Sequence, residues 1–161
     1  MNERIIAIGG ESSFTLEPGV TKYTYENAYL TPGFIDTHIH GAGGFDSSSA
    51  ASCPNSLDDM SILLGQRGVT SFVPTVVADR PEVMLENLRI LSDAMDQELH
   101  GAEAVGINIE GPFMNPKKSG AQDVAAIMPV DLGFAAELLV SFWMVPAISS
   151  NLAPCSNPAL M

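Results

Sequence analysis

Basic side chains are scarce in this sequence, and charged side chains of either sign are few. Its 161 residues include seven Lys and Arg against 19 Asp and Glu, which gives a formal net charge of −12. Proteins that bind nucleic acid or anionic membranes present a basic face, so this balance excludes both classes of partner. Hydrophobic residues nevertheless make up 46% of the chain. That content excludes intrinsic disorder and favours a folded core.

Long apolar runs and paired cysteines are also missing. The uncharged residues 138–161 contain three prolines, and their apolar core is far shorter than the roughly 20 residues that span a bilayer. No apolar run follows the N-terminus as it would in a signal peptide. Cys53 and Cys155 belong to no CxxC pair. We therefore expect a soluble protein in a reducing compartment, the cytoplasm.

From residue 31 onwards, β-branched runs alternate with helical patterns. The predicted strands are residues 34–40, 69–77 and 104–110, with a further candidate at 143–148, and the predicted helices are residues 57–66, 79–100 and 131–142. Strands that alternate with helices are typical of an α/β fold with a parallel sheet. A complete (β/α)8 barrel takes at least about 200 residues, so this chain holds about half of one.

Capping signals and an apolar stripe mark two of these helices. Asn55 or Ser56 is placed to cap the first helix, and the second begins with the spacing of a capping box, Asp79 to Glu82, with a proline in its first turn. Apolar side chains of the second helix recur every three or four positions, which predicts one buried face. They are Met84, Leu88, Leu91, Met95 and Leu99.

Residues 1–30 differ from the rest of the chain. Residues 5–8 predict a short strand, Gly9-Gly10 a turn, and residues 20–29 show the alternation of β structure. We expect a small β segment here, separate from the βα units of residues 31–161.

Two of the three histidines, His38 and His40, end the first predicted strand. Side chains alternate along a strand, so Asp36, His38 and His40 share one face and the two imidazoles converge. Two neutral imidazoles at this spacing suit a divalent transition metal such as zinc, and a neighbouring carboxylate can orient them. The alternative is a pair of polar residues that merely end a strand.

Glu110 ends the third predicted strand, and α/β folds place their active sites at the carboxyl ends of parallel strands. The loop that follows, residues 111–116, is rich in Gly and Pro, which favours a role in aiming the carboxylate. A solvated residue at a strand end is the alternative.

Three other features are weaker signals of function. The glycine-rich residues 41–44 lack the complete pattern of a phosphate-binding loop and favour a sharp turn. Lys117-Lys118 either attracts an anionic substrate or is a solvated pair. We expect His100 to interact with a helix C-terminus and not with a metal.

Residues 32–40, which read Pro-Gly-Phe-Ile-Asp-Thr-His-Ile-His, resemble the first-strand signature of the amidohydrolase superfamily, a set of metal-dependent barrel hydrolases. Three further stretches, residues 41–46, 68–75 and 109–116, resemble the N-acetylglucosamine-6-phosphate deacetylases of that superfamily, in the same order. The resemblance extends over about residues 3–122.

The resemblance implies a (β/α)8 barrel beside a small β-sandwich. Residues 1–30 then form part of the sandwich, and residues 31–161 are the first three to four βα units of an incomplete barrel. It implies that Glu110 binds the catalytic metal, zinc or iron, that His38 and His40 hold a second metal, and that Ala121 and Gln122 contact the sugar. The implied reaction is hydrolysis of the acetamide of N-acetylglucosamine 6-phosphate, with an aspartate moving the proton.

The sequence also departs from this family's pattern. Asn108 and Gln122 stand where histidines are usual, and Cys155 replaces a glutamate. The family's remaining metal histidines and its catalytic aspartate belong to later strands, so no catalytic residue is assigned here. We therefore expect the isolated chain to be inactive and to self-associate, and a full-length form to be a homo-oligomer. Two alternatives remain: a metal-dependent amidohydrolase acting on a cyclic amide or N-acyl amino acid, and a non-enzymatic half-barrel module.

Overall fold

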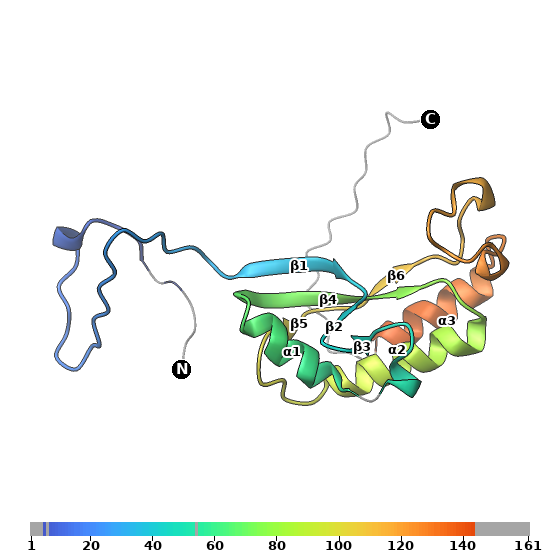
Figure 1. The fold of residues 1–161 in the computed structure, drawn as a ribbon, viewed down its shortest axis with the longest axis horizontal. Coiled ribbons are helices and arrows are strands. Elements are labelled where there is room, and N and C mark those ends of the chain that lie inside the picture. Colours follow the sequence, from blue (N-terminus) through green and yellow to red (C-terminus); the bar gives the residue numbers. More distant parts are fainter. Residues whose placement is uncertain (1–4, 6, 54, 144–161) are drawn as a thin grey trace. The chain divides into compact units, whose positions relative to one another are not determined.

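The computed structural model describes residues 5, 7–53 and 55–143 (Figure 1). The chain divides into two units, residues 1–31 and residues 32–161.

The described part of the first unit contains one regular element, the short 3-10 helix η1 (Glu11–Ser13), and no strand. The β structure expected at residues 5–8 and 20–29 is therefore wrong for residues 5, 7, 8 and 20–29. The physical reason is the lack of a partner: Ile8 and Tyr29 are almost fully exposed, and an isolated pair of strands is marginal in water without a hydrophobic face to cover.

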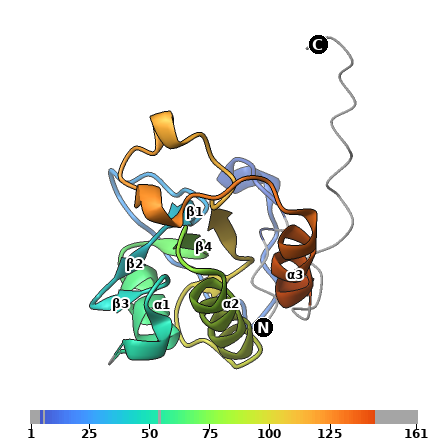
Figure 2. The same ribbon diagram turned by 90° about the vertical axis from the view of Figure 1, so that its right-hand side faces the viewer.

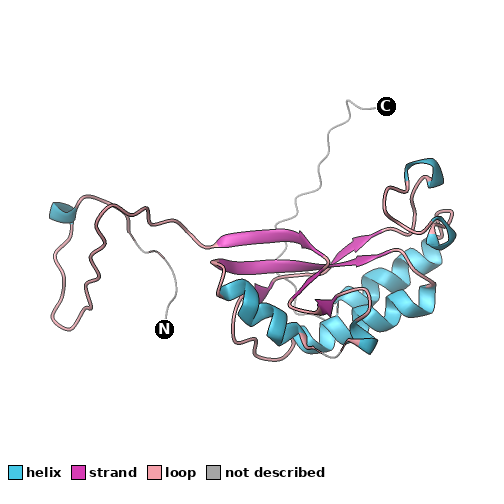
Figure 3. Ribbon diagram, in the orientation of Figure 1, coloured by secondary structure: helices cyan, strands magenta, loops and turns pink. Residues whose placement is uncertain are grey.

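A parallel sheet forms the centre of the second unit (Figure 3). The long strand β4 (Val69–Val77) lies between β1 (Phe34–Ile39) on one side and β5 (Glu103–Ala104) and β6 (Asn108–Glu110) on the other. All pairings are parallel. The third predicted strand is thus found, but as two short pieces.

Helices cover this sheet. α1 (Leu57–Gly65) and α2 (Pro81–Met95) pack against one face of it, and α3 (Leu132–Trp143) lies beside α2 (Figures 1 and 2). Minor elements are the hairpin strands β2 (Gly41–Ala42) and β3 (Phe45–Asp46) and the 3-10 helices η2 (Ala50–Ser52), η3 (Pro116–Lys118) and η4 (Val124–Ala126). The order of strands and helices confirms the α/β class with a parallel sheet. The predicted strand at residues 143–148 lies almost wholly outside the described residues.

The core fills the space between the sheet and the helices. Phe72 and Val76 of β4 are fully buried, and so are Met84, Leu88 and Leu91 of α2. The apolar stripe is therefore confirmed at its centre. Because α2 ends at Met95, Leu99 lies beyond the helix and is only partly buried against the core.

The helix caps were predicted correctly for α1 and incorrectly for α2. Ser56 and Asp59 form a reciprocal capping box at the start of α1. α2 begins with Pro81, but its N-cap residue Arg80 makes no side-chain cap. Asp79 accepts a hydrogen bond from the Arg80 N–H instead, so its carboxylate does not reach the first turn of the helix.

His100 is not the partner of a helix C-terminus, because α2 ends five residues earlier. Its backbone N–H donates to Asp58 Oδ1 at 2.7 Å, and its Nδ1 lies 2.9 Å from Asp58 Oδ2. These hydrogen bonds hold the pKa of the Asp58 carboxyl below its usual range. They fasten the start of α1 to the segment that leads into β5.

Among the described helices, none is long and apolar enough to cross a membrane.

We predict that Leu88→Ala lowers the free energy of unfolding by about 2–5 kcal/mol, because the fully buried side chain leaves a cavity between α2 and the sheet. Urea denaturation followed by circular dichroism measures the change. The matched control is Leu139→Ala on α3, where the side chain is 62% exposed. A loss equal to that of the control would contradict the position of the core.

We predict that Asp58→Asn lowers the melting temperature by a few degrees at pH 7, because the amide cannot replace the charge that the His100 N–H groups stabilise. A carboxyl whose pKa is lowered by folding contributes its stability above about pH 4 and loses it as the pH falls further. The difference from the wild type should therefore shrink in acid. Thermal melts from pH 7 to pH 3, with the exposed Asp96→Asn as control, measure it. A difference that does not change with pH would refute the charged interaction.

Candidate metal centre

Three potential metal ligands lie at one edge of the sheet, where two of its parallel strands end. His38 lies near the end of β1 with His40 just beyond it, and Glu110 is the last residue of β6. The parallel register pairs Ile39 with Pro74 and Glu110 with Val77, so both strands end beside the carboxyl end of β4. The three residues that the sequence singled out are thus brought together.

The donor atoms of these side chains converge on one point. His38 Nε2 and His40 Nε2 are 3.2 Å apart. Each of these nitrogens lies 3.4 Å from the same carboxylate oxygen, Glu110 Oε2. Within the described part of the chain, this is the group of His, Cys, Asp and Glu residues whose ligand atoms are close enough to share an ion.

The distances between these three donor atoms fit a metal ion with tetrahedral coordination. Zinc binds imidazole nitrogen and carboxylate oxygen at about 2.0–2.2 Å, which places neighbouring ligands of a tetrahedron roughly 3.3–3.5 Å apart. The three separations in the structure are 3.2, 3.4 and 3.4 Å, close to one face of such a tetrahedron. The donor set of two imidazoles and one carboxylate is also one that zinc and iron accept.

The site is open to solvent on one side. The side chains of His38 and His40 are each about half exposed, at 49% and 48%, and Glu110 is 37% exposed. A catalytic metal needs an open position for water or substrate, whereas a structural metal is enclosed by its protein ligands. The described residues therefore leave room beside the three donor atoms for further ligands, water or substrate.

The loop that follows His40 is fastened to the sheet and to α2. The Ser47 N–H donates to the His40 carbonyl, and the Val77 N–H donates to the Ser48 hydroxyl. The buried Asn87 of α2 donates to the Ser48 carbonyl at 2.6 Å. Sequence reasoning missed Ser48 and Asn87, because each contact spans about 30 residues or more and follows no local pattern.

The glycine-rich residues 41–44 form the sharp turn that was expected. β2 and β3 pair in an antiparallel hairpin, and its two central residues, Gly43 and Gly44, both have positive φ. Only glycine adopts two such conformations in succession at little cost. The hairpin turns the chain away immediately after His40.

The sequence left open which neighbouring carboxylate orients the imidazoles, and the Asp36 carboxylate bonds to backbone and not to either ring. Its Oδ1 accepts a hydrogen bond from the His38 backbone N–H at 3.2 Å. The side chain next to the other ring nitrogen of His38 is Asn108 of β6, whose Nδ2 lies 3.3 Å from His38 Nδ1. The sequence marked Asn108 only as a departure from a family pattern.

The predicted sugar-contacting residues lie in the loop after η3. Gln122 Oε1 accepts a hydrogen bond from the Ala78 N–H, directly after β4, at 3.0 Å. Because β4 ends beside Glu110, Gln122 is fastened to the edge that carries the ligand triangle. Ala121 and the Lys117-Lys118 pair are exposed, and Cys155 lies outside the described residues.

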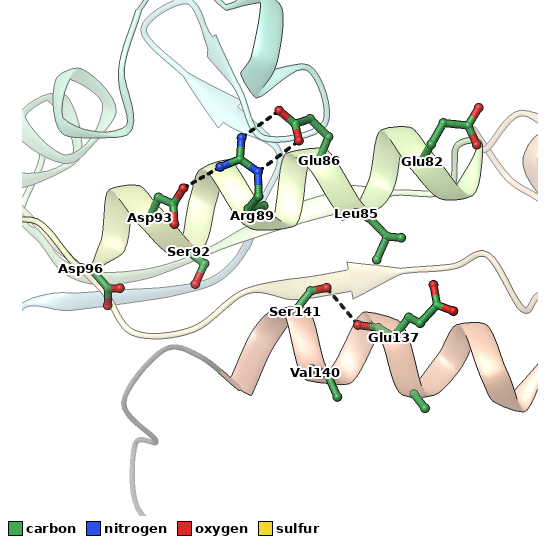
Figure 4. Close-up of a pocket in the computed structure, with 11 residues that line it drawn as sticks. Glu82, Leu85, Glu86, Arg89, Ser92, Asp93, Asp96, Glu137, Val140 and Ser141 are labelled. Carbon is green, nitrogen blue, oxygen red and sulfur yellow. Dashed lines mark hydrogen bonds and ion pairs between the residues drawn. The ribbon is translucent and has the colours of Figure 1, made fainter.

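A separate groove of about 780 Å³ runs between α2 and α3 (Figure 4). Five of its eleven lining residues are Asp or Glu, and Arg89 forms ion pairs with two of them, Glu86 and Asp93. None of the predicted site residues lines it.

Comparison with known proteins identifies the family. The model of the amidohydrolase family matches residues 29–148. An N-acetylglucosamine-6-phosphate deacetylase from Bacillus subtilis is 40% identical over 109 residues, which are 66% of this chain and 27% of the relative. The human protein of the same name is 35% identical over 120 residues, which are 70% of this chain and 28% of the relative. The chain thus spans less than a third of the length of these relatives.

Solved structures agree with this result. N-acetylglucosamine-6-phosphate deacetylase from Thermotoga maritima is 29% identical with a TM-score of 0.56, over 73% of this chain and 31% of that one. A mutant from Mycobacterium smegmatis in complex with N-acetyl-D-glucosamine-6-phosphate is 25% identical with a TM-score of 0.58, over 74% of this chain and 32% of that one. Since the family model covers most of the chain and includes all three candidate ligands, this protein belongs to the amidohydrolase family.

Proposed function

We propose that this chain contributes the first βα units and part of the metal centre of a deacetylase that hydrolyses the acetamide of an N-acetylhexosamine 6-phosphate. The observation that carries the proposal is the triangle of His38, His40 and Glu110, with sides that suit a tetrahedral metal. Its position at the carboxyl ends of parallel strands is where (β/α)8 enzymes place their active sites.

The proposed architecture is an incomplete (β/α)8 barrel over residues 31–161, with residues 1–30 as part of a flanking β-sandwich. Three observations support the barrel: the parallel order of β1, β4 and β5–β6, the helices between them, and the likeness to solved deacetylases. The sandwich rests on the family resemblance alone, because the described residues before 31 form no strand in this chain by themselves. The exposed Phe34 and Ile35 of the edge strand β1 are consistent with a sheet that continues in a complete barrel.

His38, His40 and Glu110 would hold one or two divalent metal ions, zinc or iron. Such an ion polarises a carbonyl and makes water a nucleophile at neutral pH. The chain's own contribution is to fix the three donor atoms on two strands. Ala121 and Gln122 would contact the sugar, and Gln122 is already anchored to the same edge of the sheet through Ala78.

The names of the relatives support the choice of substrate. They include N-acetylglucosamine-6-phosphate deacetylases from Bacillus subtilis and Homo sapiens. A further relative, from Escherichia coli O157:H7, is an N-acetylgalactosamine-6-phosphate deacetylase, 32% identical over 107 residues. The shared substrate class is a phosphorylated, N-acetylated amino sugar. Cytoplasmic location and assembly of a full-length form into a homo-oligomer remain predictions.

We predict that Glu110→Gln lowers zinc affinity by at least tenfold, because the anionic oxygen shared by both imidazoles becomes a neutral amide. Competition with a chromophoric chelator measures the affinity of the purified chain. The matched control, Glu103→Gln, removes an exposed carboxylate from the neighbouring strand β5. Equal zinc affinity of the wild type and the Glu110 variant would remove Glu110 from the site.

We predict that this chain's site residues support deacetylation within a complete barrel. In a chimaera, residues 31–122 replace the matching segment of the Bacillus subtilis relative, and acetate release from N-acetylglucosamine 6-phosphate is measured with zinc or iron present. We expect metal-dependent turnover that Glu110→Ala abolishes, whereas the isolated chain releases no acetate.

The second candidate substrate class is tested in the same experiment. A folded, metal-loaded chimaera that hydrolyses a cyclic amide or an N-acyl amino acid but not the phosphorylated sugar would overturn the proposed substrate. Turnover by the isolated chain above its Glu110→Ala variant would show that no further ligands are needed.

A further inference from the structure

Asn108 connects the candidate metal centre to the buried part of the sheet. Its Nδ2 lies 3.3 Å from His38 Nδ1 and 3.4 Å from the hydroxyl of Thr75. Thr75 is fully buried on β4 and is the register partner of Asn108. The Asn108 amide therefore lies between β6 and the His38 ring of β1, and it contacts the buried strand β4 through Thr75.

The direction of this contact determines which nitrogen of His38 carries the hydrogen. A neutral imidazole has one N–H and one acceptor nitrogen. When the Asn108 amide donates to Nδ1, the hydrogen is on Nε2, the nitrogen that faces His40 and Glu110. That form is suited to donate to the Glu110 carboxylate, but its Nε2 has no free lone pair for a metal.

Binding of a metal by Nε2 requires the other tautomer, in which Nδ1 carries the hydrogen and needs an acceptor. A half-turn of the Asn108 amide exchanges its nitrogen and oxygen and supplies that acceptor at the same place. The Thr75 hydroxyl donates to the Val73 carbonyl at 3.4 Å in this structure. It can turn to donate to the same amide oxygen instead, because an amide oxygen accepts two hydrogen bonds. The number of protons on His38 does not change.

We propose that Asn108 is a positioning residue that selects the tautomer of His38, through its amide nitrogen when the site is empty and through its amide oxygen when a metal is bound. This inference rests on the proposed metal centre. Neither the family match nor the ligand triangle gives Asn108 a role. The proposal makes the affinity of His38 for a metal depend on this side chain, which does not itself bind the metal.

Two substitutions of similar size separate this role from simple packing. Asn108→Asp offers only acceptors, so it should hold the Nδ1–H tautomer even without metal and keep zinc affinity at or above that of the wild type. Asn108→Leu offers neither donor nor acceptor and should weaken zinc binding by about 10–100-fold, the effect of losing such a partner. Gln97→Glu, at an exposed position just after the C-terminal end of α2, controls for the added charge.

Two readouts are measured on the purified chain: zinc affinity by chelator competition, and the His38 tautomer by 15N NMR of the imidazole nitrogens. Metal-free wild type should show the hydrogen on Nε2, Asn108→Asp should move it to Nδ1, and the Gln97→Glu control should change neither readout. Circular dichroism melts confirm that each variant is folded.

Either of two results would overturn the inference: unchanged zinc affinity in Asn108→Leu, or equal losses in Asn108→Leu and Asn108→Asp with an unchanged tautomer. Wild-type chain that binds no zinc would instead remove the metal centre itself. That failure is distinguishable, because it appears before any variant is compared.

Discussion

The parallel register of β1, β4 and β6 is the constraint on which the rest of the site depends. It sets Glu110 beside the last residue of β4 and brings the end of β1 to the same edge. Without it, the two histidines and a glutamate about 70 residues further along the chain would have no reason to meet. The register is itself fixed by burial, because a slip of one residue would turn Phe72 and Val76 away from the helices.

The two faces of the sheet therefore differ in chemistry: one is apolar and packed, and the other is polar. One face carries the apolar side chains that pack on α1 and α2 and supply most of the hydrophobic stabilisation. The other carries polar residues whose hydrogen bonds run from strand to strand, from His38 through Asn108 to Thr75. The rigidity of the packed face limits movement of the polar one, which is what a set of preorganised ligands requires.

Elements that depend on local sequence signals were predicted correctly. Elements and contacts that depend on residues distant in the sequence were not. β4 and the Ser56 cap follow from β-branched runs and capping chemistry and were found as predicted. The strands expected before residue 31 were wrong because nothing in the described chain pairs with them. His38, His40 and Glu110 could be chosen by residue type, strand position and family resemblance. The contacts of Asn108 and Asn87 could not, because they depend on strand register and helix packing.

X-ray absorption at the zinc edge of the zinc-loaded chain tests the central claim most directly, because it reports the ligands and their distances. We expect a first shell of nitrogen and oxygen at about 2.0–2.1 Å. We also expect the outer-shell scattering of two imidazoles, one of which is lost in His40→Ala. Six oxygen ligands with no imidazole signal would contradict the assignment of this edge of the sheet as a metal centre.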